Sequence, residues 1–130
     1  MTTRTARPIR TTVADAHIAI AARQAFIADS MSAEWTTSPF RPGDDLAFEE
    51  RGQLMADTRD AEGQQLYVVY SYATPIAWVL PNGTVRFPAV RYSMTTSRHQ
   101  GQAARGLDVT PAYPGRRPRL GPYAQRAGRC

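Results

Sequence analysis

The chain has 130 residues, enough for one domain with a single modest core, and its net charge of +5 arises from sixteen basic residues against eleven acids. A single cysteine, Cys130, and two histidines exclude a disulfide framework and a zinc site of ordinary spacing. No segment is apolar enough to span a membrane and no signal peptide is visible, so we expect a cytoplasmic protein without a membrane partner.

Every basic residue is an arginine, and the charges are unevenly distributed. Residues 15–62 carry four arginines and ten acids, whereas residues 63–107 carry four arginines and no acid. Residues 108–130 add five arginines against Asp108 alone. This segregation indicates either a polyanionic partner or attraction between the two halves of the chain. GC-rich coding would also produce an arginine-only composition.

The N-terminal part predicts an arm, a helix and a strand. Residues 1–11 are polar and contain Pro8, which is typical of a flexible arm. Thr12 and Asp15 resemble a helix start, and the Ala-rich segment that follows favours a helix to about Arg23. From residue 25 to residue 37, a period of two predicts a strand with one apolar face, made of Ile27, Met31, Ala33 and Trp35.

Residues 38–65 predict irregular structure. Residues 38–44 are dense in turn formers and form a loop. Leu46 and Phe48 suit a short strand. Residues 49–65 are acidic and polar, so we expect a loop with a single helical turn.

The next segment holds the clearest strand and turn signals. Residues 66–72 are apolar on both faces and rich in β-branched and aromatic side chains, which is typical of a central strand covered on two sides. Pro75 predicts a bend or an edge position before a second strand over residues 76–80. Asn82-Gly83 predicts a hairpin with a type I′ turn, because both residues tolerate positive φ. Residues 85–87 return along that hairpin, and residues 90–94 alternate as a further strand.

A short helix and a tail complete the chain. Ser97 and Gln100 match the capping box that opens a helix, which would run to about Arg105 with Gly106 as its C-terminal cap. Residues 108–130 are rich in Arg, Pro and Gly, and predict an extended or disordered tail.

Two runs carry a resemblance to a known family. YVVYSYATPIAW over residues 67–78 and VRYSMTTSRHQ over residues 90–100 resemble a small uncharacterised domain of actinobacterial phages and plasmids. The resemblance implies a phage- or plasmid-borne protein, and it implies no activity, fold or ligand.

The polar run before residue 100 is the candidate site. If Ser97 caps a helix, the first backbone N–H groups and the Arg98 guanidinium converge on a spot that suits phosphate or carboxylate. The alternative is that Ser97 and Gln100 only cap the helix. We assign nine residues to a ligand-binding site: Arg86, Arg91, Ser93, Thr95, Thr96, Ser97, Arg98, His99 and Gln100.

Two further interpretations are weaker. Strand aromatics interleaved with arginines suit base stacking, although strand tyrosines more often belong to a core. Ser97 and His99 also suit a hydrolase or transferase, which would need a carboxylate within hydrogen-bond reach of His99. Because no phosphate-loop, dinucleotide-binding or metalloprotease pattern occurs, we expect no enzyme, no catalytic residue, no metal and no cofactor.

We therefore expect an α+β domain over residues 12–107. It would hold a small, mostly antiparallel sheet, an N-terminal helix and a short helix after the last strand. The expected function is that of a non-enzymatic accessory protein that binds nucleic acid or another phosphate-bearing ligand. The alternative is a protein-interaction module that engages a host factor or self-associates, and the oligomeric state stays open.

Overall fold

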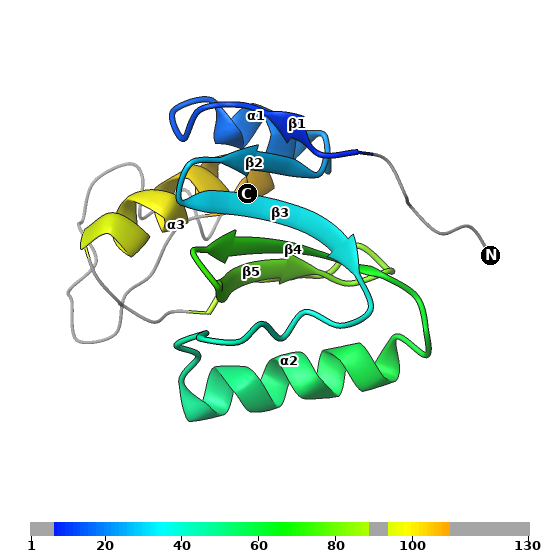
Figure 1. Ribbon diagram of the computed structural model, residues 1–130. Coiled ribbons are helices and arrows are strands. Elements are labelled where there is room, and N and C mark those ends of the chain that lie inside the picture. The colour runs from blue at the N-terminus through cyan, green and yellow to red at the C-terminus, as the bar shows by residue number, and fades with distance from the viewer. Residues whose placement is uncertain (1–6, 89–93, 110–130) are drawn as a thin grey trace.

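Six strands form one mixed, mostly antiparallel sheet whose spatial order follows the chain from β1 to β6. The structure is a computed structural model that describes residues 7–88 and 94–109 (Figure 1). The strands are β1 (Ile9–Arg10), β2 (Phe26–Ala28), β3 (Met31–Thr36), β4 (Leu66–Ser71), β5 (Thr74–Val79) and β6 (Val85–Arg86). The helices are α1 (Ala16–Ala21), α2 (Phe48–Asp60) and α3 (Met94–Leu107). The expected α+β fold is confirmed, and only the pairing of β1 with β2 is parallel.

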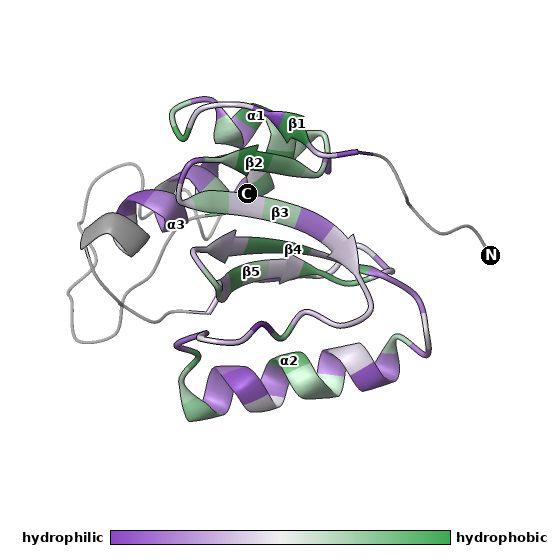
Figure 2. Cartoon of the chain, in the orientation of Figure 1, coloured by the Kyte–Doolittle hydropathy of each residue, from purple (hydrophilic) through white to green (hydrophobic). Residues whose placement is uncertain are grey.

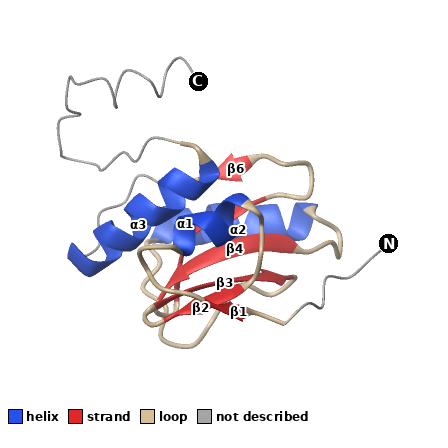
Figure 3. Ribbon diagram, turned by 90° about the horizontal axis from the view of Figure 1, so that it is seen from above, coloured by secondary structure: helices blue, strands red, loops and turns tan. Residues whose placement is uncertain are grey.

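Helices cover both faces of the sheet. α1 and α3 lie side by side on one face, and α2 lies on the other (Figures 1 and 3). Every residue of β4 and β5 is buried, which confirms a central strand covered on two sides. Figure 2 shows apolar residues along β4 and β5 and mainly hydrophilic residues along α2. Burying each large apolar side chain of these strands stabilises the fold by about 1.5–3 kcal/mol.

The bend expected around Pro75 is a tight turn between β4 and β5. Tyr72 has a φ of 55°, and its N–H donates to the carbonyl of Ser30 over 2.7 Å. Pro75 lies inside β5 opposite Tyr70, beside a shift in the ladder register. The missing N–H of the proline therefore falls where the ladder is already irregular.

The hairpin between β5 and β6 is confirmed, but its predicted turn type is wrong. The N–H of Gly83 donates to the Leu80 carbonyl over 2.8 Å, which places Pro81 at the first central position. Proline fixes φ near −65°, and a type I′ turn needs positive φ there. Only Gly83 of this loop has a positive φ, 92°, so the loop has three residues and closes on a left-handed glycine.

The single strand predicted over residues 25–37 is instead the hairpin of β2 and β3. Ala28 pairs with Met31, and Asp29, with a φ of 53°, forms the turn with Ser30. Neither turn residue is Gly or Pro, so the sequence offered little sign of it. The prediction for Ile27 was also wrong, because its side chain is 40% exposed whereas Phe26 and Ala28 are buried.

The loop and short strand predicted over residues 46–65 are wrong, because most of this segment forms α2. Phe48 begins the helix, and its side chain is 90% exposed. Only Leu54 and Asp57 of α2 are buried, so the helix has almost no apolar periodicity to recognise. Leu46, just before the helix, is buried in the core between α2 and the sheet.

The predicted N-terminal helix is confirmed as the shorter α1. Ala16, Ala19 and Ile20 face the core, and Ile18 is 61% exposed. Two positions after the end of α1, Arg23 lies in the left-handed region at a φ of 53°. The Gln24 N–H donates to the Ala19 carbonyl over 2.9 Å. This is a Schellman cap with arginine where glycine would be least strained.

The helix predicted after residue 97 exists, but its start and end differ from the expectation. α3 begins at Met94, so Ser97 lies inside the first turn and does not cap it. Of the strand predicted over residues 90–94, residues 90–93 lie outside the described residues. Gly106 lies within α3, and the cap is Asp108, with a φ of 61°, whose neighbour Val109 donates its N–H to the Ala104 carbonyl over 2.9 Å.

Candidate functional site

His99, predicted as a ligand contact, is buried between α3 and the tips of two hairpins. Its Nε2 lies 2.9 Å from Ser30 Oγ, and its Nδ1 lies 2.7 Å from Ser71 Oγ. The side chain is 1% exposed, and burial together with the Arg98 charge lowers the pKa of His99, while Asp29 opposes this shift. A neutral imidazole donates from one nitrogen and accepts at the other, so two serine hydroxyls satisfy it fully.

The hydrogen bonds of His99 leave its ring nitrogens without a contact to Ser97, the contact that the hydrolase interpretation needs. Both ring nitrogens of His99 bond hydroxyl groups, which leaves neither nitrogen for Ser97 or for a carboxylate. The Oγ of Ser97 is buried and has no hydrogen-bond partner within the described residues. The pair therefore lacks the nucleophile–base contact that such chemistry needs.

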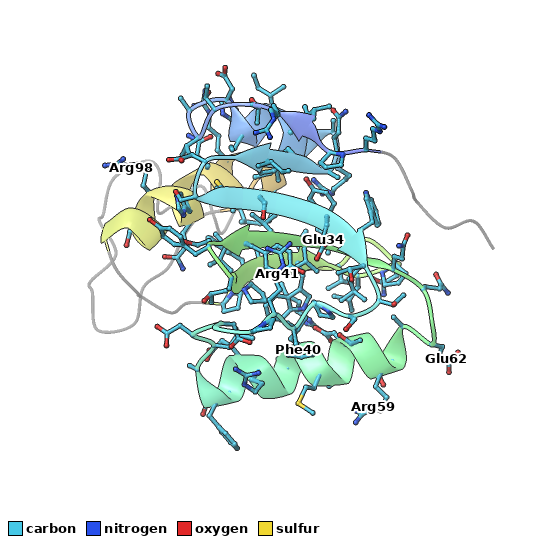
Figure 4. All side chains as sticks on the ribbon, in the orientation of Figure 1. Glu34, Phe40, Arg41, Arg59, Glu62 and Arg98 are labelled. Carbon is cyan, nitrogen blue, oxygen red and sulfur yellow. The ribbon has the colours of Figure 1, made fainter. Side chains whose placement is uncertain are left out.

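The other residues of the predicted site are dispersed. Gln100 is 1% exposed and faces the interior. Thr95 and Thr96 lie in the first turn of α3, and Arg91 and Ser93 lie outside the described residues. Arg98 is exposed and points away from the domain (Figure 4).

Arg86 lies on the opposite face of the sheet, where it helps to hold α2. Its Nε and Nη2 bond the two carboxylate oxygens of Asp57 over 3.0 and 3.2 Å. Asp57 also accepts from Trp78 Nε1 over 2.8 Å and from Gln53 Nε2 over 3.0 Å. Burial alone would raise the pKa of Asp57, but the bonds from Arg86, Trp78 and Gln53 outweigh it and lower that pKa. Arg86 and Arg98 thus do not share a site.

The aromatic residues of β4 and β5 do not form a base-stacking surface. Tyr67, Tyr70 and Trp78 are each 0% exposed. Tyr67 donates its hydroxyl to the Gln24 carbonyl over 2.7 Å, and Tyr70 donates to Glu34 over 2.6 Å. Burial raises the pKa of both tyrosines above the ordinary value. These rings belong to the core.

Two arginines of α3, Arg98 and Arg105, are exposed. Arg98 and Arg105 are seven positions apart, which is two turns, so they project from the same side of the helix. Among the described residues, no acid forms an ion pair with either of them. The sequence pointed to Arg98 through its acid-free surroundings, but it gave no reason to select Arg105.

A cleft that the sequence did not predict lies where β2 begins and β3 ends. Its volume is about 600 Å³, and Arg23, Glu34, Trp35 and Arg41 are among its lining residues. These residues come from the turn after α1, from β3 and from the following loop, so no local pattern joins them.

The fold and these surfaces define a small α+β domain with a buried polar link and an outward arginine pair on its last helix. Residues 24–112 match a family of unknown function, DUF8033, and because the match covers more than half of the chain, the protein belongs to that family. No curated protein and no solved structure matches the chain.

Helical membrane spans and metal-binding clusters are both absent from residues 7–88 and 94–109. No helix there is long and apolar enough to cross a membrane. No group of three or more His, Cys, Asp or Glu side chains that could hold a metal ion occurs in the same ranges.

Proposed function

We propose that the protein is a non-enzymatic accessory protein, borne by a phage or plasmid, that binds nucleic acid through α3 and the arginine-bearing segments on either side of it. The observation that carries this proposal is the position of the two arginines of α3, which form no ion pair within the part of the chain that the structure describes. Arg98 and Arg105 face solvent on one side of a helix that lies between two segments with arginines and no acid.

Ion pairing separates the arginines of the described residues into two groups. Four of the nine in the described residues pair with acids: Arg41 with Glu34, Arg51 with Asp44, Arg59 with Asp60, and Arg86 with Asp57. A paired guanidinium has its charge largely compensated, so it attracts a phosphate less strongly. The other five described arginines form no ion pair within the described residues: Arg98 and Arg105 on α3, and Arg7, Arg10 and Arg23 earlier in the chain.

The excess positive charge lies outside the described residues. The described residues carry nine arginines against eleven acids, a net charge of −2. Residues 1–6, 89–93 and 110–130 carry the remaining seven arginines and no acid. Two of these segments, residues 89–93 and 110–130, flank α3 in the chain and carry six of these seven arginines.

A helix side that presents exposed arginines favours phosphate contacts over base contacts. Arginine forks bond phosphate oxygens in pairs, and these contacts release counterions whatever the base sequence. With Tyr67, Tyr70 and Trp78 in the core, β4 and β5 offer no aromatic platform for bases. We therefore expect binding with little sequence preference.

Fluorescence anisotropy with labelled single- and double-stranded oligonucleotides tests the proposal. Replacing both α3 arginines, Arg98→Ala with Arg105→Ala, should weaken binding by about tenfold or more, because two charge-assisted phosphate contacts are lost. Arg59→Ala is the matched control. Arg59 is also exposed but lies on α2 across the sheet and pairs with Asp60, so its loss should leave the affinity unchanged.

An oligonucleotide affinity that does not fall in the double variant would favour the interaction-module alternative. Equal affinities for the double variant and the wild type would remove α3 from the interface. A stoichiometric complex with a host protein whose affinity is almost independent of salt would replace nucleic acid as the partner.

A further inference from the structure

The cleft at the start of β2 and the end of β3 contains three charged side chains, and two of them neutralise each other. Arg41 Nη2 lies 3.2 Å from Glu34 Oε2, and its guanidinium carbon lies 3.4 Å from the centre of the Tyr70 ring. Arg41 is therefore fixed by an acid on one side and an aromatic face on the other. The charge left over in the cleft is that of Arg23.

Arg23 is held in place without being neutralised. Its Nη1 donates to the Ile20 carbonyl over 2.8 Å, and no acid forms an ion pair with it within the described residues. A carbonyl is a neutral acceptor, so the guanidinium keeps its full charge and its other N–H groups. A fixed, partly buried guanidinium of this kind suits an anionic oxygen.

Trp35 supplies a flat apolar wall beside this charge. Its indole Nε1 donates to the Arg23 carbonyl over 2.9 Å, and its ring packs against Tyr67 with centroids 5.3 Å apart. Both contacts fix the orientation of the ring. The indole remains only partly buried and lines the cleft.

These features set the chemistry of a ligand. The volume of about 600 Å³ lies in the range of small-molecule sites. An anchored guanidinium next to an anchored indole suits a molecule that joins one phosphate to a flat ring. Glu34 and Arg41 compensate each other, so Arg23 alone is left as a counter-charge in the cleft, which suits one phosphate better than a polyphosphate.

We propose that this cleft binds a single nucleotide unit, with its phosphate on Arg23 and its base against Trp35. The unit is either a free nucleoside monophosphate or a nucleotide of a strand held by α3. The second source rests on the proposed function, whereas the first does not.

Calorimetric titration of the full chain with the four common nucleoside monophosphates tests the site. We expect saturable binding of at least one of them with one site per chain, weaker binding of inorganic phosphate, and weaker binding of the corresponding triphosphate. Absence of saturation by any monophosphate at millimolar concentration would overturn the proposal. A triphosphate that binds more tightly than its monophosphate would do the same.

Arg23→Gly is the decisive variant. Arg23 has a φ of 53°, a conformation that glycine adopts without strain, so the variant should fold and keep its melting temperature. Losing the guanidinium should weaken monophosphate binding by about tenfold or more. Unchanged affinity in the folded variant would remove Arg23 from the site.

Arg10→Gln is the matched control. Arg10 is exposed on the neighbouring strand β1 but is not among the residues that line the cleft, so its loss should leave monophosphate affinity unchanged. Equal losses in the two variants would indicate unspecific attraction and contradict the site.

The variant that lacks Arg98 and Arg105 distinguishes the two proposals. It should lose oligonucleotide affinity and keep monophosphate affinity. If the monophosphate binds and the oligonucleotide does not, the cleft is a site for a free nucleotide and the proposed function fails alone. If both affinities fall together in this variant, the cleft is not a separate site and the proposal for it is wrong.

Discussion

Single buried polar side chains connect the layers of this domain. Asp57 links α2 to β5 and β6 through Trp78 and Arg86, and His99 links α3 to two hairpin tips through Ser30 and Ser71. The sequence could not identify these links. Ser71 and Ser30 lie 28 and 69 positions from His99, and no local pattern marks a distant partner. A histidine and a serine near a helix start suggested a ligand site, but burial makes His99 part of the core.

The Asp57 link predicts a large loss of stability on Asp57→Asn. The change leaves the partly exposed Arg86 without its counter-charge and weakens the bond from Trp78. We expect the free energy of unfolding to fall by about 3 kcal/mol, the lower end of the range for breaking a buried ion pair. Denaturant unfolding measures it. Asp60→Asn, an exposed position on the same helix, should change stability by less than about 0.5 kcal/mol. Similar effects at both positions would contradict the link.

The His99 link predicts that stability falls in mildly acidic solution. Its native pKa is lowered by burial, whereas the unfolded pKa is about 6.5. Above that pH both states are neutral and stability is complete. As pH falls below about 6.5, the unfolded state binds a proton that the native state resists, so the native state loses stability.

Thermal unfolding of the wild type and of His99→Gln, followed from about pH 7.5 to about pH 5.5, measures this effect. The wild type should lose melting temperature across this window, and the variant should lose less. Parallel curves for the two proteins would show that His99 does not titrate in this way.

Among the elements, those with a local signal could be predicted, whereas α2 and the hairpin of β2 and β3 could not. The apolar run of β4 and the Asn82-Gly83 turn carry local signals, and both hairpin strands were found. α2 was missed because polar bonds at Asp57 hold it, with Leu54 as its one fully buried apolar side chain. Periodicity detects an apolar stripe and does not detect polar anchors.

The contact between α1 and α3 depends on a glycine that looked like a cap. A Cβ on Gly106 would meet Ile20 Cβ at 2.6 Å and the His17 carbonyl oxygen at 2.8 Å. Gly106→Ala should therefore destabilise the protein by about 1–3 kcal/mol. Gly101→Ala, in the same helix with nothing within 4 Å, should stabilise it by up to about 1 kcal/mol. Chemical denaturation of both variants measures the difference, and equal effects would contradict the close packing.

At the scale of the whole molecule, residues 7–88 and 94–109 together carry a slight negative charge, and the other residues carry a strong positive charge. Residues 113–130 lie beyond the segment that matches the family, and their Arg-, Pro- and Gly-rich composition is typical of a segment that buries little apolar surface. Removing residues 113–130 should therefore leave the melting temperature nearly unchanged and weaken oligonucleotide binding, because five arginines are lost. A large fall in melting temperature would show that this segment belongs to the fold.

The most direct measurement of nucleic-acid binding is the salt dependence of oligonucleotide affinity for the full chain. The logarithm of the association constant should fall steeply and linearly with the logarithm of salt concentration. Without Arg98 and Arg105, the slope should become shallower by about two. An affinity that does not change with salt, or identical slopes for the two proteins, would contradict binding through α3.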